Sequence, residues 1–165
     1  MKTRTILLHG FTLVELMITL AVAVVALSIA VPSFQSAFQA NRLTTQANAL
    51  VTAINLARSE AIKRGVSTTL RAGGSSFEDG WCVHLGASCA GTDILRQFEA
   101  MNQISVDSGG VTVVTFDARG SKSVPNGVVN IDLQPDGCSA GTADRLRTIN
   151  IANTGRASVT AGNCT

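Results

Sequence analysis

The sequence predicts an α+β fold in which one long N-terminal helix packs on an antiparallel β-sheet domain. Two observations carry this prediction. Residues 11–31 are almost wholly apolar, and apolar side chains then recur at helical spacing as far as residue 61. From Val66 onward the pattern changes to short β-branched segments between glycine-containing turns, which is typical of antiparallel strands. The 165 residues suffice for one modest domain and a hydrophobic anchor.

The first element, residues 11–31, reads as a membrane span in which Glu15 is the only charged residue. A helix of this length is about 31 Å long and matches the roughly 30 Å hydrocarbon core of a bilayer. A carboxylate inside it costs about 2.5–3.5 kcal/mol on insertion scales, so it needs a partner or a purpose. Lys2 and Arg4 precede the span and favour a cytoplasmic N-terminus.

The helix continues beyond the span as an amphipathic segment. Pro32 is expected to kink or interrupt it. Further on, Glu60 and Arg64 form an i,i+4 pair in the favourable order, and Gly65 is typical of a helix C-terminus. One long helix is therefore predicted over about 11–64, with an apolar stripe that packs on a sheet. The alternative role for the stripe is a helix–helix contact in a filament. The stripe consists of Leu43, Ala47, Leu50, Ile54, Ala57 and Ala61.

The rest of the chain is predicted to form short strands. Their expected ranges are 66–72, 81–86, 94–99, 111–117, 128–133, 146–152 and 157–161. Glycine pairs and Asn-Gly or Asp-Gly steps supply the turns between them. Glu78 and Asp79 are expected to form a turn before Gly80, so they are not read as a catalytic pair of acids.

Four cysteines lie beyond the hydrophobic segment: Cys82, Cys89, Cys138 and Cys164. An even number behind a membrane-targeting segment indicates disulfides formed in an oxidising compartment. Three pairings can form, and we predict the most local one, Cys82–Cys89 with Cys138–Cys164. The chain-entropy model gives about 2.5 kcal/mol for the first loop and about 3.5 kcal/mol for the second. Neither spacing resembles a zinc knuckle, so no metal or other cofactor is expected.

Charge and titratable residues argue against an enzyme. From Phe11 onward, 11 lysines and arginines balance 11 aspartates and glutamates, so there is no global basic field for nucleic acid. His84 is the one histidine beyond the first ten residues. It lies in an expected strand beside a cysteine, where a structural histidine with satisfied nitrogens is expected. No phosphate-binding glycine loop occurs. No catalytic residue is predicted.

Residues 10–16, Gly-Phe-Thr-Leu-Val-Glu-Leu, resemble the processing site of type IV prepilins and type II secretion pseudopilins. The resemblance implies that a prepilin peptidase cuts after Gly10 and N-methylates Phe11. The family's glutamate falls at Glu15, which would neutralise the new amino group on Phe11 of a neighbouring subunit during assembly. The apolar run is too long for a cleaved secretory signal. A plain signal anchor leaves both Glu15 and the Gly10–Phe11 step unexplained.

Three later segments resemble the GspH/FimT branch of this family, which includes H-type pseudopilins and the FimT and FimU minor pilins. They are residues 50–65, 79–85 and 116–123. The resemblance implies a pilin-like fold in four parts. These are a leader over 1–10, the transmembrane half of the helix over 11–31, its amphipathic half over 32–65, and a β-rich periplasmic or extracellular head over 66–165.

The resemblance further implies a non-enzymatic minor type IV pilin that is incorporated near the tip of a pilus and helps its assembly. Such a protein spans the bacterial inner membrane once, with its C-terminal domain in the periplasm, and then reaches the cell surface in the pilus. Its partners would be the prepilin peptidase, the inner membrane, and other minor and major pilins or pseudopilins. The alternative within the same fold family is the H-type pseudopilin of a type II secretion system.

A DNA-binding minor pilin for natural transformation is a second alternative. FimT-type minor pilins carry a C-terminal Gly-Arg-x-Arg motif that contributes to DNA capture. Residues 155–158, Gly-Arg-Ala-Ser, match it without the second arginine. A phosphate-binding patch would combine Arg156 with Arg145 and Arg147, which lie nearby in sequence, and with Arg119 and Lys122 from an earlier loop. The opposing interpretation is that these are solvated charges that protect a sheet edge from aggregation. No aromatic residue for stacking bases is evident.

Overall fold

The computed structural model describes residues 11–86 and 88–165. It consists of a long helix, α1 (Leu13–Arg64), followed by short strands and one turn of 3₁₀ helix. By their contacts the residues form two compact units, one that ends at Phe38 and one over Gln39–Thr165. The first holds the beginning of α1. The second, the head, holds the rest of α1 and all the described strands.

Helix α1 has recognisable start and stop signals. The Thr12 hydroxyl accepts a hydrogen bond of 3.1 Å from the backbone N–H of Glu15, as an N-cap residue does. At the other end Gly65 adopts φ +69°, and its N–H donates to the Ala61 carbonyl. The helix is continuous through Pro32, so the expected interruption does not occur there. A proline removes a single i→i−4 bond, which a long helix can survive.

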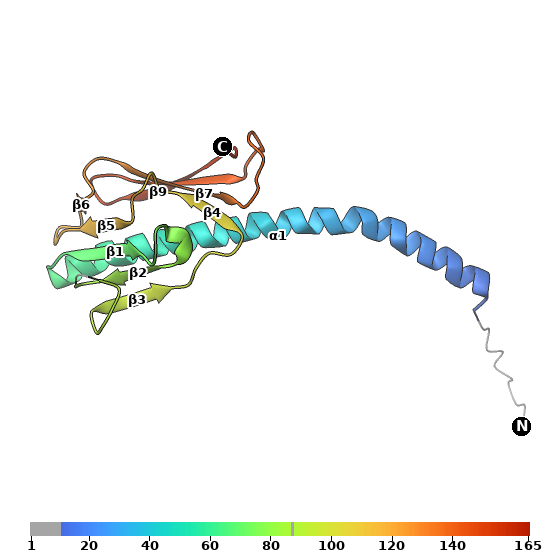
Figure 1. The fold of residues 1–165 in the computed structure, drawn as a ribbon, viewed down its shortest axis with the longest axis horizontal. Helices are drawn as coiled ribbons and strands as arrows, with labels where there is room; N and C mark the ends of the chain where they lie inside the picture. The colour runs from blue at the N-terminus through green and yellow to red at the C-terminus, as the bar shows by residue number, and fades with distance from the viewer. Residues whose placement is uncertain (1–10, 87) are drawn as a thin grey trace, which may run out of the picture. The chain divides into compact units, whose positions relative to one another are not determined.

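The strands of the head form two antiparallel sheets (Figure 1). The first sheet has the order β3-β2-β1-β5-β6 and consists of β1 (Thr68–Ala72), β2 (Trp81–His84), β3 (Ile94–Phe98), β5 (Val113–Phe116) and β6 (Lys122–Val124). The second has the order β4-β7-β8-β9 and consists of β4 (Ile104–Asp107), β7 (Val129–Pro135), β8 (Leu146–Ile151) and β9 (Ala157–Gly162).

One hydrophobic core joins α1 to both sheets. The predicted apolar stripe is confirmed, since all six of its residues are buried. These helix residues pack against inward-facing side chains of the first sheet, such as Trp81 and Phe116, and of the second, such as Ile131 and Ile149. At the C-terminal end of α1, the Arg64 Nε lies 2.6 Å from the Glu60 carboxylate, as the i,i+4 spacing predicts.

All seven predicted strands are present, and the structure adds two that the sequence pattern did not indicate, β4 and β6. The two-sheet arrangement was also not foreseen. The predicted turn at Glu78 and Asp79 is the 3₁₀ helix Phe77–Asp79, closed by a capping box between Ser76 and Asp79. The head thus presents two sheets, their connecting loops and two disulfides as candidate functional surfaces.

Candidate functional site

The N-terminal part of α1 presents an exposed apolar surface. An 18-residue window has a mean hydropathy of 2.5, and none of it is buried against the rest of the chain. By length and composition, the helix can therefore cross a membrane. The exposed side chains include Phe11, Leu13, Met17, Leu20 and Leu27. A continuous apolar surface of this kind requires lipid or another apolar partner.

Polar side chains within the apolar segment are mostly satisfied by their own helix. The Thr19 hydroxyl donates to the Leu16 carbonyl, and the Ser28 hydroxyl donates to the Val25 carbonyl at 2.7 Å. Such internal bonds are what a lipid environment demands. Glu15 differs, because among the described residues its carboxylate forms no ion pair. It lies in the first turn of α1, where the helix dipole favours a negative charge.

The predicted processing site lies at the edge of the described chain. Gly10 is outside the described residues, whereas Phe11 is described and its side chain is 81% exposed. Phe11 and Thr12 precede the first residue of α1. Phe11, the residue that would follow the predicted cleavage, therefore lies outside α1.

Both predicted disulfides are present in the head. Cys82 pairs with Cys89, with Cα atoms 5.9 Å apart, and Cys138 pairs with Cys164, with Cα atoms 6.1 Å apart. The first links β2 to the β2–β3 loop. The second links the loop after β7 to the segment after β9. The two bonds therefore restrain one sheet each.

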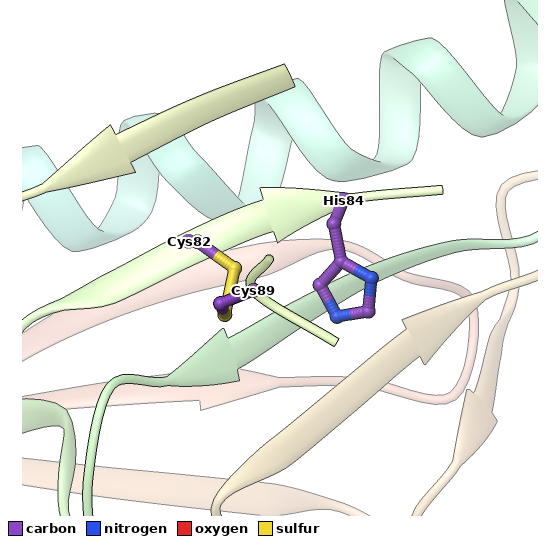
Figure 2. Close-up of side chains that lie close together, drawn as sticks. All are labelled: Cys82, His84 and Cys89. Carbon is purple, nitrogen blue, oxygen red and sulfur yellow. A yellow bond between two sulfur atoms is a disulfide. The ribbon is translucent and has the colours of Figure 1, made fainter. Parts of the chain in front are cut away.

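His84 lies on β2 next to the first disulfide (Figure 2). It is only 1% exposed, as a structural residue should be. The expectation of two satisfied nitrogens is not confirmed, because neither Nδ1 nor Nε2 makes a hydrogen bond of normal geometry among the described residues. The backbone of Gly86 nevertheless lies close enough to interact with the ring. Burial lowers the pKa of His84, and the nearby backbone of Gly86 and carboxylate of Asp93 oppose that effect only in part.

The lowered pKa makes the stability of the head depend on pH. Below the ordinary histidine pKa of about 6.5, the unfolded chain takes up a proton that folded His84 resists, so the free energy of unfolding falls as the pH falls. We expect the melting temperature of the full chain in detergent to drop between pH 7.5 and 5.5. In His84→Gln the drop should be smaller. Equal pH dependence in both proteins would contradict this origin.

The three candidate DNA-binding arginines do not form one cluster. In the β8–β9 pairing, Arg147 lies opposite Ala161 and Ile151 lies opposite Ala157. Arg156, in the β8–β9 turn, lies opposite Ala152, since its carbonyl accepts from the Ala152 N–H. It is therefore at the other end of β8 from Arg147, about 17 Å away along the strand. Arg147 is mostly buried, and its Nη1 is 3.0 Å from the Asp144 carboxylate. Arg145 lines a cavity of about 210 Å³ together with Gln39 and Asp136.

Two glycines bring Arg156 close to a different cation. Gly155 and Gly120 are both buried, and a Cβ atom on Gly155 would lie 2.0 Å from the Gly120 carbonyl oxygen. The β8–β9 turn with Arg156 therefore contacts the β5–β6 loop with Arg119. Both arginines are exposed, and the Arg119 Nε lies 3.8 Å from the Asp117 carboxylate.

Lys122 cannot take the role of a phosphate contact that the sequence suggested. It is 7% exposed, and its Nζ donates to the carbonyl oxygens of Pro125 and Gly127. Burial lowers the pKa of its amino group. The side chain thereby holds the β6–β7 loop in place, and it is not available at the surface for a ligand.

Comparison with known proteins agrees with this arrangement. A model of the family described as type II transport protein GspH matches residues 46–155. A model of the prokaryotic N-terminal methylation motif matches residues 9–31. The search of curated proteins finds no significant match.

Two solved structures share the fold, both of the type IV minor pilin FimU from Pseudomonas aeruginosa. The first is 23% identical in sequence, with a TM-score of 0.62 over 76% of this chain and 96% of that one. The second, from another crystal form, is 22% identical, with a TM-score of 0.62 over 74% of this chain and 100% of that one. The likeness shows a common arrangement of helix and sheets.

Proposed function

Because the chain belongs to the GspH family of pilin-like proteins, we propose that it is a minor type IV pilin. It would be processed by a prepilin peptidase and incorporated in the pilus, near the tip, to help assembly. The observation that carries the proposal is the exposed apolar segment with Glu15 at its start, within a matched N-terminal methylation motif. The family is structural, and the proposed role requires no catalytic residue.

The proposed mechanism begins with cleavage after Gly10, which would create an amino group on Phe11. A cation and the Glu15 carboxylate would then lie close to each other along the same apolar segment. Each is costly in lipid without a partner. If the amino group of one subunit meets Glu15 of its neighbour, both charges are neutralised and the two helices take one axial register. Before assembly the protein would span the inner membrane once, with its head in the periplasm.

The alternative assignment is the H-type pseudopilin of a type II secretion system, which is supported by the description of the matching family. The two assignments share processing, methylation and the role of Glu15. They differ in where the filament ends, because a pilus reaches the cell surface and a pseudopilus stays in the periplasm. The place of the mature chain therefore distinguishes them.

The test is mass spectrometry of the N-terminal peptide from sheared surface filaments and, separately, from membranes. We expect a peptide that begins with N-methylated Phe11 in the sheared fraction. The same peptide found in membranes alone would favour the pseudopilin. A chain that still begins at Met1 in both fractions would contradict processing. Gly10→Val, which adds a branched side chain at the cleaved bond, should abolish the methylated peptide and serves as the matched control.

DNA binding is a second candidate function, and the contact between Gly155 and Gly120 favours it, because two exposed arginines flank that contact. If the head binds duplex DNA, the slope of log K against log salt is negative. Arg119→Ala with Arg156→Ala should make that slope less steep by about 1.8, since each lost phosphate contact removes about 0.9. Arg147→Ala, which removes a mostly buried arginine paired with Asp144, should leave the slope unchanged. Equal slopes in all three proteins would exclude these arginines as phosphate contacts.

A further inference from the structure

One face of β2 brings together three side chains that can bind metal ions. Cys82 and His84 are two residues apart on the strand, so their side chains point to the same face of the sheet. Trp81 and Val83 point to the other face and belong to the core under α1. Cys89 approaches from the β2–β3 loop, and Figure 2 shows the His84 ring beside the two sulfur atoms.

The geometry of this group is already compact. One ligand atom from each of the three residues lies within 4.8 Å of the other two. Cys82 and His84 are each 1% exposed. Neither nitrogen of the His84 ring makes a hydrogen bond of normal geometry in the described part of the head, although the backbone of Gly86 lies near the ring. Buried polar groups in folded proteins nearly always make hydrogen bonds of good geometry, so a buried ring without one, beside two sulfurs, calls for an explanation.

We propose that Cys82, His84 and Cys89 form a metal site for Zn²⁺ or a similar soft cation when the Cys82–Cys89 disulfide is reduced. Two thiolates and an imidazole are a known zinc ligand set, in which water takes the fourth position. Thiolate and imidazole ligands suit zinc and copper(I), and they do not suit magnesium or calcium. In the oxidised state the sulfurs are bonded to each other and the site is closed.

Reduction of the Cys82–Cys89 disulfide is a balanced reaction when a dithiol is the reductant. Thiol–disulfide exchange breaks the S–S bond, leaves a thiol on Cys82 and on Cys89, and leaves the reductant as a disulfide. Binding of Zn²⁺ then displaces one proton from each thiol, and the imidazole binds in its neutral form. The cation thus competes with reoxidation, because each state uses the same two sulfur atoms.

The sulfur atoms must separate for the metal to enter. Zinc–sulfur bonds of about 2.3 Å in a tetrahedral site place two sulfurs about 3.8 Å apart, against about 2.0 Å in a disulfide. Cys82 and His84 are fixed by the strand pairing of β2 with β1 and β3. Cys89 lies outside any strand and is only half-buried, so its side chain is the one that can turn away.

The second disulfide supplies a matched control within the same chain. Cys138 and Cys164 also give two thiols on reduction, yet among the described residues no third metal-ligating side chain joins them. Cys138→Ser with Cys164→Ser removes this pair and leaves the proposed site intact. If any reduced cysteine pair bound Zn²⁺, removing Cys138 and Cys164 would reduce the amount of zinc bound. The proposed site needs only Cys82 and Cys89 with His84, so its zinc binding should not change.

The experiment uses the full chain in detergent, oxidised or reduced with a phosphine, and titrated with Zn²⁺ against a chelator of known affinity. We expect one tightly bound Zn²⁺ per reduced chain and none per oxidised chain. Changes outside the ligand shell already weaken zinc sites by about 10–100-fold, so the ligand change His84→Gln should weaken binding at least tenfold. Cys138→Ser with Cys164→Ser should bind as the wild type does.

A Co²⁺ spectrum of the reduced wild type keeps the proposal testable if His84→Gln fails to fold. Absorption bands of tetrahedral thiolate coordination are expected. Their absence would overturn the proposal, as would zinc binding that survives His84→Gln unchanged or disappears in the Cys138→Ser, Cys164→Ser protein. A reduced head that unfolds by circular dichroism and binds no Zn²⁺ would overturn it as well. None of these outcomes depends on whether the chain is incorporated in a pilus.

Discussion

Replacing Gly155 with alanine should destabilise the head more than any other single methyl group added to a glycine. Gly155 has φ +77°, where an alanine is strained by about 1–2 kcal/mol. The new Cβ would also lie 2.0 Å from the Gly120 carbonyl oxygen and 3.2 Å from the Arg58 Nε. Forcing these groups apart costs a further 1–3 kcal/mol or so. We expect a fall in melting temperature on the order of 10 °C.

The reason for so large an effect is that Gly155 lies where three elements meet. The Arg58 Nε donates to the Gly120 carbonyl at 3.1 Å, which ties α1 to the β5–β6 loop of the first sheet. Gly155 brings the β8–β9 turn of the second sheet onto the same carbonyl. A side chain there would separate the two sheets at their common contact with the helix.

Gly127→Ala is the matched control for this prediction. Gly127 has a similar φ of +85°, but a Cβ on it would meet nothing within 4 Å. Its replacement should cost only the conformational strain, about 1–2 kcal/mol. Thermal unfolding of the three full-length proteins in the same detergent measures the difference. Equal losses in Gly155→Ala and Gly127→Ala would mean that the contact with Gly120 contributes nothing.

Replacing Glu15 with leucine should leave the protein in the membrane and remove it from filaments. Insertion becomes easier, because an uncompensated carboxylate costs about 2.5–3.5 kcal/mol in the bilayer. Assembly becomes harder, since the amino group of the neighbouring Phe11 would lose its partner. Breaking a buried ion pair from one side costs about 3–5 kcal/mol, which corresponds to a more than hundredfold loss of incorporation. Quantitative mass spectrometry of sheared filaments and membranes measures the ratio.

Ser28→Ala is a suitable control for Glu15→Leu. It also replaces a polar side chain of the same apolar segment, but the Ser28 hydroxyl is satisfied within its own helix by the Val25 carbonyl. Incorporation of this variant should match the wild type. If Glu15→Leu is incorporated normally, charge pairing does not set the register of the subunits. If both variants fail, the segment is sensitive to any change and Glu15 has no special role.

Most elements of the fold could be predicted from the sequence because their signals are local. The apolar run that ends at Val31, the helical stripe from Leu43 to Ala61 and the glycine after Arg64 each lie within a few turns of one helix. The disulfide pairing also followed from short separations along the chain. The two missed strands, β4 and β6, are edge strands with a single neighbour each. They are also only four and three residues long, so their sequences are too short to show a clear alternating pattern.

Among the candidate sites, too, some could be predicted from a short stretch of sequence and others could not. Gly10, Phe11 and Glu15 could be named from the sequence, because a processing motif is a short linear segment, and their roles stay predictions. The arginines could not be grouped in this way. Arg145, Arg147 and Arg156 are close in sequence, but β8 separates the last from the other two. Lys122, which looked like part of a basic loop, is buried and bonded to two backbone carbonyls.

The sequence by itself determined the exposed apolar segment, its single carboxylate, the long helix and the disulfide pairing of the cysteines, because hydrophobicity, helical periodicity and chain separation are properties of neighbouring residues. Tertiary structure alone decided that the strands divide into two sheets, that Gly155 meets Gly120, and that His84 lies buried beside Cys82 and Cys89. Those facts depend on which distant strands exchange backbone hydrogen bonds. Strand pairing is chosen by the packing of the whole core on α1, and no short stretch of sequence contains that information.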